Sequence, residues 1–174
     1  MLRALFQQWR GQDSPLYDKL KEVPLFRDLK KRELKEVEGV LQKRTFESGQ
    51  AVFEQGNPGV GMYVVISGEV EISQIDEGDQ LVLTQVGDGG FFGETALLDD
   101  AVRTATAITV EETEVMFFSR SGLLTLAENR PHLGVKIVMQ LSQVIAERLR
   151  RANRGLRTAR EEVAALQKTD EESE

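Results

Sequence analysis

The most informative stretch of the sequence is Gly87-Asp-Gly-Gly-Phe-Phe-Gly-Glu-Thr-Ala-Leu-Leu-Asp-Asp-Ala-Val-Arg-Thr-Ala-Thr106. Because β-rich segments flank it on both sides, we expect it to form a turn and a short helix across one mouth of a β-structure. Gly93 lets the backbone turn tightly without a Cβ in the way of a ligand. The amides that follow, at Glu94 to Ala96, would then point out of a helix N-terminus, an arrangement that suits an anion.

Two charged side chains in this stretch extend the prediction. Arg103, at the start of the next strand, can return a guanidinium to the same place, and its planar, two-pronged set of donors suits a phosphate. Glu94 cannot bind a phosphate, but a carboxylate beside one can accept a hydrogen bond from a sugar hydroxyl. The stretch therefore points to a sugar phosphate with a free hydroxyl. The alternative is that Glu94 and Arg103 form only a surface ion pair. The presence of Gly93 and Ala96 at the matching positions of the turn favours a ligand site instead.

Short β-rich runs separated by glycine-containing breakers lie on both sides of this stretch. They are residues 45–46, 51–53, 62–66, 69–72, 81–84, 104–110 and 114–118. Since no connection is long enough for a crossover helix, these runs predict an antiparallel roll or barrel and exclude a doubly wound parallel sheet. The expected fold class is α+β, an antiparallel β-roll (double-stranded β-helix, jelly-roll like) over residues 44–120. Short N-terminal helices and a long C-terminal helix complete it.

Helical patterns flank the expected roll. We expect residues 1–15 to be a leader, and residues 16–43 to form two short helices that lid the sheet, with Asp28 as the N-cap of the second. Helical periodicity returns over residues 121–168, where Pro131 fits the start of a helix. Residues 169–174 are expected to be a disordered acidic tail.

An apolar seam runs along the expected C-terminal helix. Its residues alternate in spacing between four and three: Ile145, Leu149, Ala152, Leu156, Ala159, Val163 and Leu166. This is the spacing of the a and d positions in a heptad repeat, so it predicts a weak two-stranded coiled coil and a homodimer. Packing of the seam back on the roll is the alternative.

Arginines crowd the same helix, at positions 148, 150, 151, 154, 157 and 160. They suit a basic face for nucleic acid or another anion, but we interpret them as the solvated flank of the coiled coil. In that interpretation they pair in part with Glu147, Glu161 and Glu162.

Composition excludes several classes of function. The chain has 174 residues, no Cys, one His and a formal net charge of -7. Without Cys, and with His132 alone, neither a thiolate nucleophile nor a multi-histidine metal site is possible, so we expect no metal, no cofactor and no catalysis. No apolar run approaches the ~20 residues of a membrane span, and the negative charge disfavours general nucleic-acid binding. The lack of Cys fits a cytoplasmic protein.

The stretch 87–106 resembles the phosphate-binding cassette of the cyclic-nucleotide-binding family, which includes catabolite activator proteins, regulatory subunits of cyclic-nucleotide-dependent kinases and nucleotide-gated channels. Residues 92–98 and 103–106 carry the resemblance, and it extends over about residues 20–149. It implies that Glu94 takes the ribose 2'-hydroxyl and Arg103 the exocyclic phosphate oxygens. Backbone amides near Thr95, Ala96 and Thr104 would complete the phosphate cage.

The resemblance also bears on the base. The Thr104 hydroxyl can bond either purine or phosphate, so the choice between cAMP and cGMP stays open. In catabolite activator proteins the long dimer helix touches the base, and alignment puts Ala152 and Asn153 at that place, of which only Asn153 can donate and accept hydrogen bonds. The expected ligand-binding residues are Gly93, Glu94, Thr95, Ala96, Arg103, Thr104, Ala105 and Asn153.

Taken together, the sequence predicts a stand-alone sensor of cAMP or cGMP that signals through its C-terminal helix, either to its own dimer or to an unknown protein partner. Family transcription factors carry a helix-turn-helix after this helix, and only about a dozen residues follow Arg160 here, so we expect no DNA partner. The alternative is a nucleotide-free dimeric scaffold with a degenerate roll.

Overall fold

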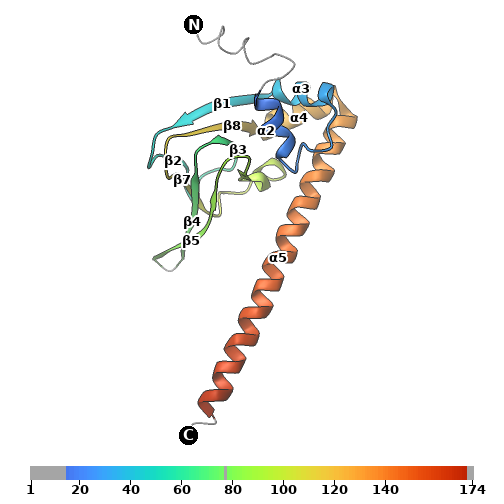
Figure 1. The fold of residues 1–174 in the computed structure, drawn as a ribbon. Helices are drawn as coiled ribbons and strands as arrows, with labels where there is room; N and C mark the ends of the chain where they lie inside the picture. The colour runs from blue at the N-terminus through green and yellow to red at the C-terminus, as the bar shows by residue number, and fades with distance from the viewer. Residues whose placement is uncertain (1–14, 77, 172–174) are drawn as a thin grey trace.

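Two four-stranded antiparallel sheets form a roll, which short helices precede in the sequence and one long C-terminal helix follows (Figure 1). The structure is a computed structural model that describes residues 15–76 and 78–171. The strand orders are β1-β8-β3-β6 and β2-β7-β4-β5. This arrangement confirms the α+β class and the antiparallel roll. The expected leader lies outside the described residues except for Pro15, the first residue of a helix.

The strands are β1 (Leu41–Phe46), β2 (Ala51–Phe53), β3 (Gly61–Ser67), β4 (Val70–Asp76), β5 (Asp79–Val86), β6 (Phe91–Phe92), β7 (Thr106–Thr109) and β8 (Thr113–Ser119). The helices are α2 (Pro15–Glu22), α3 (Lys31–Glu38), the 3-10 helix η1 (Glu94–Leu97), α4 (Arg120–Asn129) and α5 (Pro131–Glu171). Each of the seven predicted runs overlaps a strand. The sequence missed β6, whose two residues pair with Tyr63 and Val64 of β3.

Three local expectations need correction. The first strand begins at Leu41, because Leu41 pairs with Phe118 of β8, so residues 41–43 are not helical. Lys30, not Asp28, is the N-cap of α3, since its backbone N–H donates to Glu33 Oε2 at 2.7 Å. Asp28 instead accepts a hydrogen bond from Gln140 Nε2 of α5 at 2.6 Å.

The third correction concerns the C-terminal end. Helix α5 continues to Glu171, three residues into the segment expected to be disordered, while residues 172–174 lie outside the described part. The preceding residues Ala164, Ala165, Leu166, Gln167 and Lys168 are all strong helix formers, which accounts for the extension.

Strand β3 divides the core into two parts. Met62, Val64 and Ile66 face the helices, in a cluster with residues such as Phe26 and Phe118. The alternate residues Tyr63 and Val65 face the interior of the roll. Because successive side chains point to opposite faces of a strand, a strand covered on both faces reads as a continuous apolar run, as residues 62–66 do.

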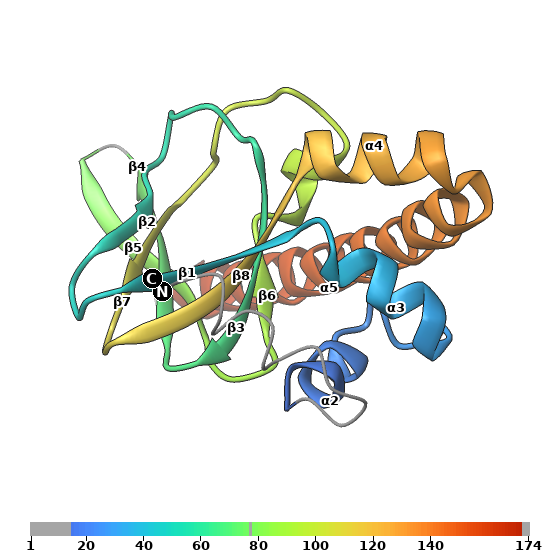
Figure 2. The ribbon, with the colours of Figure 1, turned by 90° about the horizontal axis from the view of Figure 1, so that it is seen from above.

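The helices gather at one end of the roll, where α2, α3 and α4 surround the beginning of α5 (Figure 2). Leu133, Ile137 and Leu141 of α5 are buried in the cluster that β3 shares with these helices. Helix α5 then runs past the roll and extends beyond it (Figure 1). One helix therefore connects the core of the molecule with a long projecting segment.

The predicted apolar seam is only partly covered in this structure. Ile145 packs against the core, whereas Leu149 is 60% and Leu156 53% exposed, so this part of the seam does not pack back on the roll. The side chains of Val163 and Leu166 lie outside those described. The coiled coil and the homodimer stay predictions. None of the described helices is both long and apolar enough to span a membrane.

Candidate functional site

The phosphate-binding cassette predicted from the sequence, residues 87–106, turns sharply at Gly93. Gly93 has φ 73°, in the left-handed region, and precedes the one-turn helix η1. A Cβ at this position would lie 2.6 Å from Arg103 Nη1. Within the turn, the amide of Ala96 donates to the Gly93 carbonyl oxygen at 3.3 Å. Glycine is therefore required both by the backbone conformation and by the close approach of the Arg103 guanidinium.

The backbone around Arg103 is held by the loop that follows β2. The Arg103 N–H donates to Asn57 O, and the Gly56 N–H donates to Arg103 O, both at 2.8 Å. An isolated antiparallel bridge between Pro58 and Val102 adds to this pairing. Two loops that are distant in sequence thus fix the position from which the Arg103 side chain reaches Gly93.

The Arg103 side chain lies inside the roll. It is only 5% exposed, and its guanidinium donates to Gly61 O at 2.6 Å through Nη2 and to Gly93 O at 3.2 Å through Nη1. The ring of Phe53 covers the guanidinium at 4.0 Å. Burial lowers the pKa of Arg103, while Tyr63 and Glu94 act in the opposite direction. Among the described residues Arg103 forms no ion pair, so its positive charge is buried without a directly bound carboxylate.

Glu94, at the start of η1, is the second buried charge of the site. It is 4% exposed, and its Oε1 accepts a hydrogen bond from Arg148 Nη1 of α5 at 2.7 Å. Arg148 also donates to Phe91 O at 3.3 Å and lies 4.9 Å from the Phe91 ring. The carboxylate therefore belongs to the cassette and also anchors the long helix.

Two polar atoms in this region have no partner. They are Nε of Arg103, a donor, and Oε2 of Glu94, an acceptor. Within the part of the chain that the structure describes, these are the only buried side-chain nitrogen and oxygen atoms without a hydrogen-bond partner. Because nearly all buried polar groups in folded proteins are paired, such a donor and acceptor suit a ligand that brings an anionic acceptor and a hydroxyl donor.

The structure places the other expected site residues as follows. Ala96 and Ala105 are buried beside the two charged residues, whereas Thr95 and Thr104 are exposed. Asn153 is exposed on α5, five residues beyond Arg148 and so about 7.5 Å further along the helix axis. It makes no hydrogen bond or ion pair with the described residues of the cassette. The cassette residues come together in the fold, and the base contact of Asn153 stays a prediction.

Sequence reasoning missed three residues of this site. Phe53 and Tyr63 line the Arg103 guanidinium. Arg148, which we assigned to a solvated flank, instead binds Glu94, and this corrects that assignment. The spacing along the helix could have predicted this contact, because Arg148 follows the buried Leu141 by two helical turns and so lies on the same face, toward the roll.

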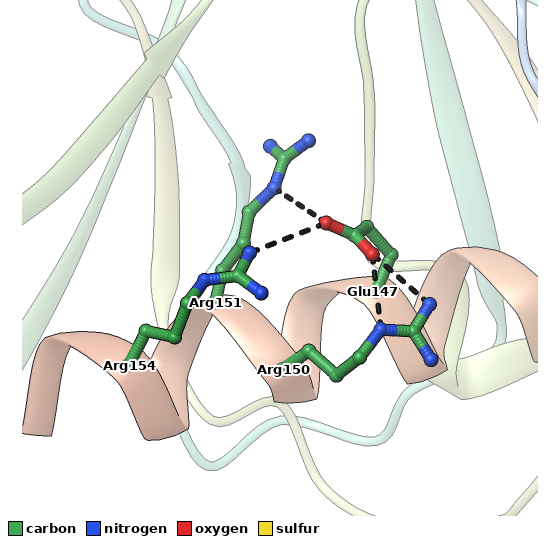
Figure 3. Close-up of polar contacts among 4 residues, drawn as sticks. All are labelled: Glu147, Arg150, Arg151 and Arg154. Atoms are coloured by element: carbon green, nitrogen blue, oxygen red, sulfur yellow. Dashed lines mark hydrogen bonds and ion pairs between the residues drawn. The ribbon is translucent and has the colours of Figure 1, made fainter. Parts of the chain in front are cut away.

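The other arginines of α5 agree better with the expected solvated flank. Glu147 accepts contacts from Arg150, Arg151 and Arg154 at 2.9, 3.3 and 3.5 Å (Figure 3). Its hydrogen bond with Arg150 is the main reason that the pKa of Glu147 is lowered. Arg157 pairs with Glu161 at 2.9 Å. The Glu162 side chain lies outside those described.

The fold and site together define a β-roll that buries an arginine and a glutamate at a glycine turn, and comparison with known proteins gives the same class. Residues 43–130 match the family model described as "Cyclic nucleotide-binding domain". The chain belongs to the cyclic nucleotide-binding domain family.

Two curated relatives illustrate the match. The chain is 34% identical over 135 residues to the "Cyclic AMP receptor protein" of Thermus thermophilus, covering 77% of this chain and 61% of the relative. It is 37% identical over 117 residues to a "CRP-like cAMP-activated global transcriptional regulator" of Mycobacterium tuberculosis, covering 67% and 50%. The chain thus spans about half to three fifths of the length of these relatives. The first relative is named as a receptor for cyclic AMP and the second as a transcriptional regulator that cAMP activates.

Solved structures of related proteins have the same fold. The Thermus thermophilus catabolite activator protein superposes with a TM-score of 0.70 at 34% identity, over 76% of this chain and 61% of that one. The regulatory domain of Toxoplasma gondii PKA, crystallised with cAMP, superposes with a TM-score of 0.62 at 31% identity, over 67% and 44%. The roll is therefore shared with proteins of both bacterial and eukaryotic origin.

Proposed function

We propose that this chain binds a cyclic mononucleotide as a regulatory module and has no catalytic activity of its own. The observation that carries the proposal is the buried pair of unpartnered atoms, Arg103 Nε and Glu94 Oε2. Both residues meet at the Gly93 turn, because Arg103 donates to the Gly93 carbonyl oxygen and Glu94 directly follows Gly93. A cyclic nucleotide supplies both missing groups, because its phosphate is an acceptor and its ribose 2'-hydroxyl is a donor. We infer a cytoplasmic location from the absence of Cys.

In this proposal Arg103 binds the exocyclic phosphate oxygens and Glu94 binds the ribose 2'-hydroxyl. Backbone amides near Thr95, Ala96 and Thr104 complete the phosphate cage. A phosphate also offsets the buried positive charge of Arg103, which has no directly bound carboxylate among the described residues. Binding and neutralisation of the buried cation are thus one event.

We favour cAMP over cGMP as the ligand. The named relatives include a cyclic AMP receptor protein and a cAMP-activated regulator, and the Toxoplasma gondii regulatory domain was crystallised with cAMP. Thr104 and Asn153, which we expect near the base, carry polar groups that suit either purine. A direct comparison of the two nucleotides decides between them.

We further propose that the signal leaves through α5. Glu94 contacts Arg148 of α5 through Oε1 while its Oε2 stays free for the ligand, so one carboxylate links the nucleotide to the helix. The exposed Leu149 and Leu156 then suit a homodimer formed through the seam. Nucleotide shifts the position or order of α5 only as far as it binds one arrangement better than the other.

The test is displacement of a fluorescent cyclic nucleotide from the purified chain by cAMP, cGMP and 5'-AMP. Arg103→Ala should weaken cyclic nucleotide binding by at least about 100-fold, because two or more charge-assisted hydrogen bonds are lost. Arg150→Ala, which removes an arginine of the solvated flank, is the matched control and should bind normally. Retained micromolar affinity in Arg103→Ala would contradict the proposal. If the unsubstituted chain, freed of bound nucleotide, binds neither the fluorescent nucleotide nor cAMP or cGMP, the result would favour the dimeric scaffold instead.

A further inference from the structure

The Arg103 guanidinium is held in the roll without a carboxylate. Its fixed partners are the carbonyl oxygens of Gly61 and Gly93 and the aromatic rings of Phe53 and Tyr63. The Phe53 ring is the closer one, with the guanidinium carbon 4.0 Å from its centroid, compared with 5.9 Å for Tyr63. At this distance a desolvated cation is attracted to the negative face of the ring.

We propose that Phe53 is a positioning residue for nucleotide binding: its ring fixes the Arg103 guanidinium by a cation–π contact and leaves the charge available for the phosphate. This inference rests on the proposed function. A carboxylate in the same place would neutralise the guanidinium and compete with the phosphate for its donors. A ring holds the cation without cancelling its charge.

The geometry of the contact supports this role. All five N–H groups of a guanidinium point outward in its plane. The guanidinium carbon of Arg103 lies over the Phe53 ring, 4.0 Å from its centroid, and an aromatic carbon ring is not a hydrogen-bond acceptor that uses up an N–H group; the buried Nε still lacks a partner. The ring contact therefore leaves Nε of Arg103 available as a donor to a phosphate oxygen.

Phe53 is itself firmly placed. Its ring centroid lies 5.8 Å from those of both Tyr63 and Phe92, which are buried inside the roll. The register between β2 and β7 shifts between Ala51 and Phe53, and such a bulge redirects a side chain relative to its neighbours. The irregular strand thus places the ring beneath Arg103.

The experiment replaces Phe53, site-specifically, with phenylalanines that carry increasing numbers of ring fluorines. Fluorination weakens the negative face of the ring but keeps its apolar, planar shape. Affinity for cAMP should fall stepwise along the series, by roughly tenfold at full fluorination. The same series at Phe117, whose ring lies 3.9 Å from the Arg44 guanidinium, is the matched control and should leave affinity unchanged.

If the affinity for cAMP stays constant along the fluorination series at position 53 while the unsubstituted chain binds normally, this inference alone is overturned. Absence of cAMP and cGMP binding by the unsubstituted chain overturns the proposed function and this inference with it. A second measurement needs no variant: in the NMR spectrum, the Phe53 ring current should shift the Arg103 side-chain protons upfield, with and without nucleotide. Unshifted protons in the nucleotide complex would also overturn the inference.

Discussion

Glu94 and Arg148 form an ion pair at 2.7 Å although 54 positions separate them in the sequence. The Glu94 side chain is almost fully buried in the cassette, whereas that of Arg148 is 48% exposed on α5. The ion pair therefore connects α5, just after its last residues that pack against the core, to the proposed ribose-binding group. Any ligand that contacts Glu94 also contacts the anchor of the helix.

Arg148→Ala should destabilise the fold more than removal of other arginines of α5. It leaves a buried carboxylate without its cation, which we expect to cost about 1–2 kcal/mol after allowance for the exposure of Arg148. Urea unfolding measures this change. Arg150→Ala is the control, because Arg150 pairs with Glu147 on the helix surface. Equal effects of the two substitutions would show that the buried carboxylate does not depend on Arg148.

Gly93→Ala should lower the stability of the fold and also abolish nucleotide binding. A non-glycine residue in the left-handed conformation costs about 1–2 kcal/mol, and the new Cβ would also displace Arg103. Gly49→Ala is the matched control, since Gly49 has φ 78° and no atom within 4 Å of the added Cβ. Both variants should unfold at lower urea concentration, and only Gly93→Ala should lose cAMP binding. Normal binding by Gly93→Ala would contradict the close approach of Arg103.

Leu149→Glu combined with Leu156→Glu should prevent the proposed homodimer. Both leucines are exposed a or d residues of the heptad seam, and glutamates there would place like charges against each other. Analytical ultracentrifugation should give a dimer for the unsubstituted chain and a monomer for the variant. Thr158→Glu, outside the seam, should leave the dimer intact. A monomeric unsubstituted chain at high micromolar concentration, with and without nucleotide, would disprove dimerisation.

Acid should weaken the contact between α3 and α5. A hydrogen bond from Lys136 is the main reason that the pKa of Glu33 is lowered. A carboxyl with a lowered folded pKa contributes stability above its unfolded pKa, about 4.3, and loses it as pH falls through the folded value. Glu33→Gln should therefore reduce the pH dependence of unfolding below about pH 4.3. Glu54→Gln, at an exposed position, is the control, and identical pH profiles for all three chains would contradict the contact.

Much of the fold could be predicted from the sequence, because strands and turns leave patterns among residues that are close together in the chain. The β-rich runs separated by glycine-containing breakers indicated an antiparallel roll, and each run overlaps a strand. Strand β6 escaped prediction because two residues are too short to show an alternating pattern. The N-cap of α3 was wrong because Asp28 and Lys30 both precede the helix, and the tertiary contact of Asp28 with Gln140 is invisible in the sequence.

The site was predictable to a different degree. Gly93, Glu94 and Arg103 lie in one motif, and the structure brings them together. Arg148 was misassigned because its partner lies in another element, and charge patterning along a helix considers only neighbours three or four residues away. Phe53 was missed because a bulge, not strand alternation, sets its direction. The part played by each residue toward a nucleotide stays a prediction.

The most direct test of the account is isothermal titration calorimetry of the purified, nucleotide-free chain with cAMP, cGMP and 5'-AMP. The account predicts saturable binding of one molecule of cAMP per chain, weaker binding of cGMP, and no comparable binding of the non-cyclic monophosphate. Heats indistinguishable from dilution for both cyclic nucleotides, from a chain shown to be folded, would contradict it.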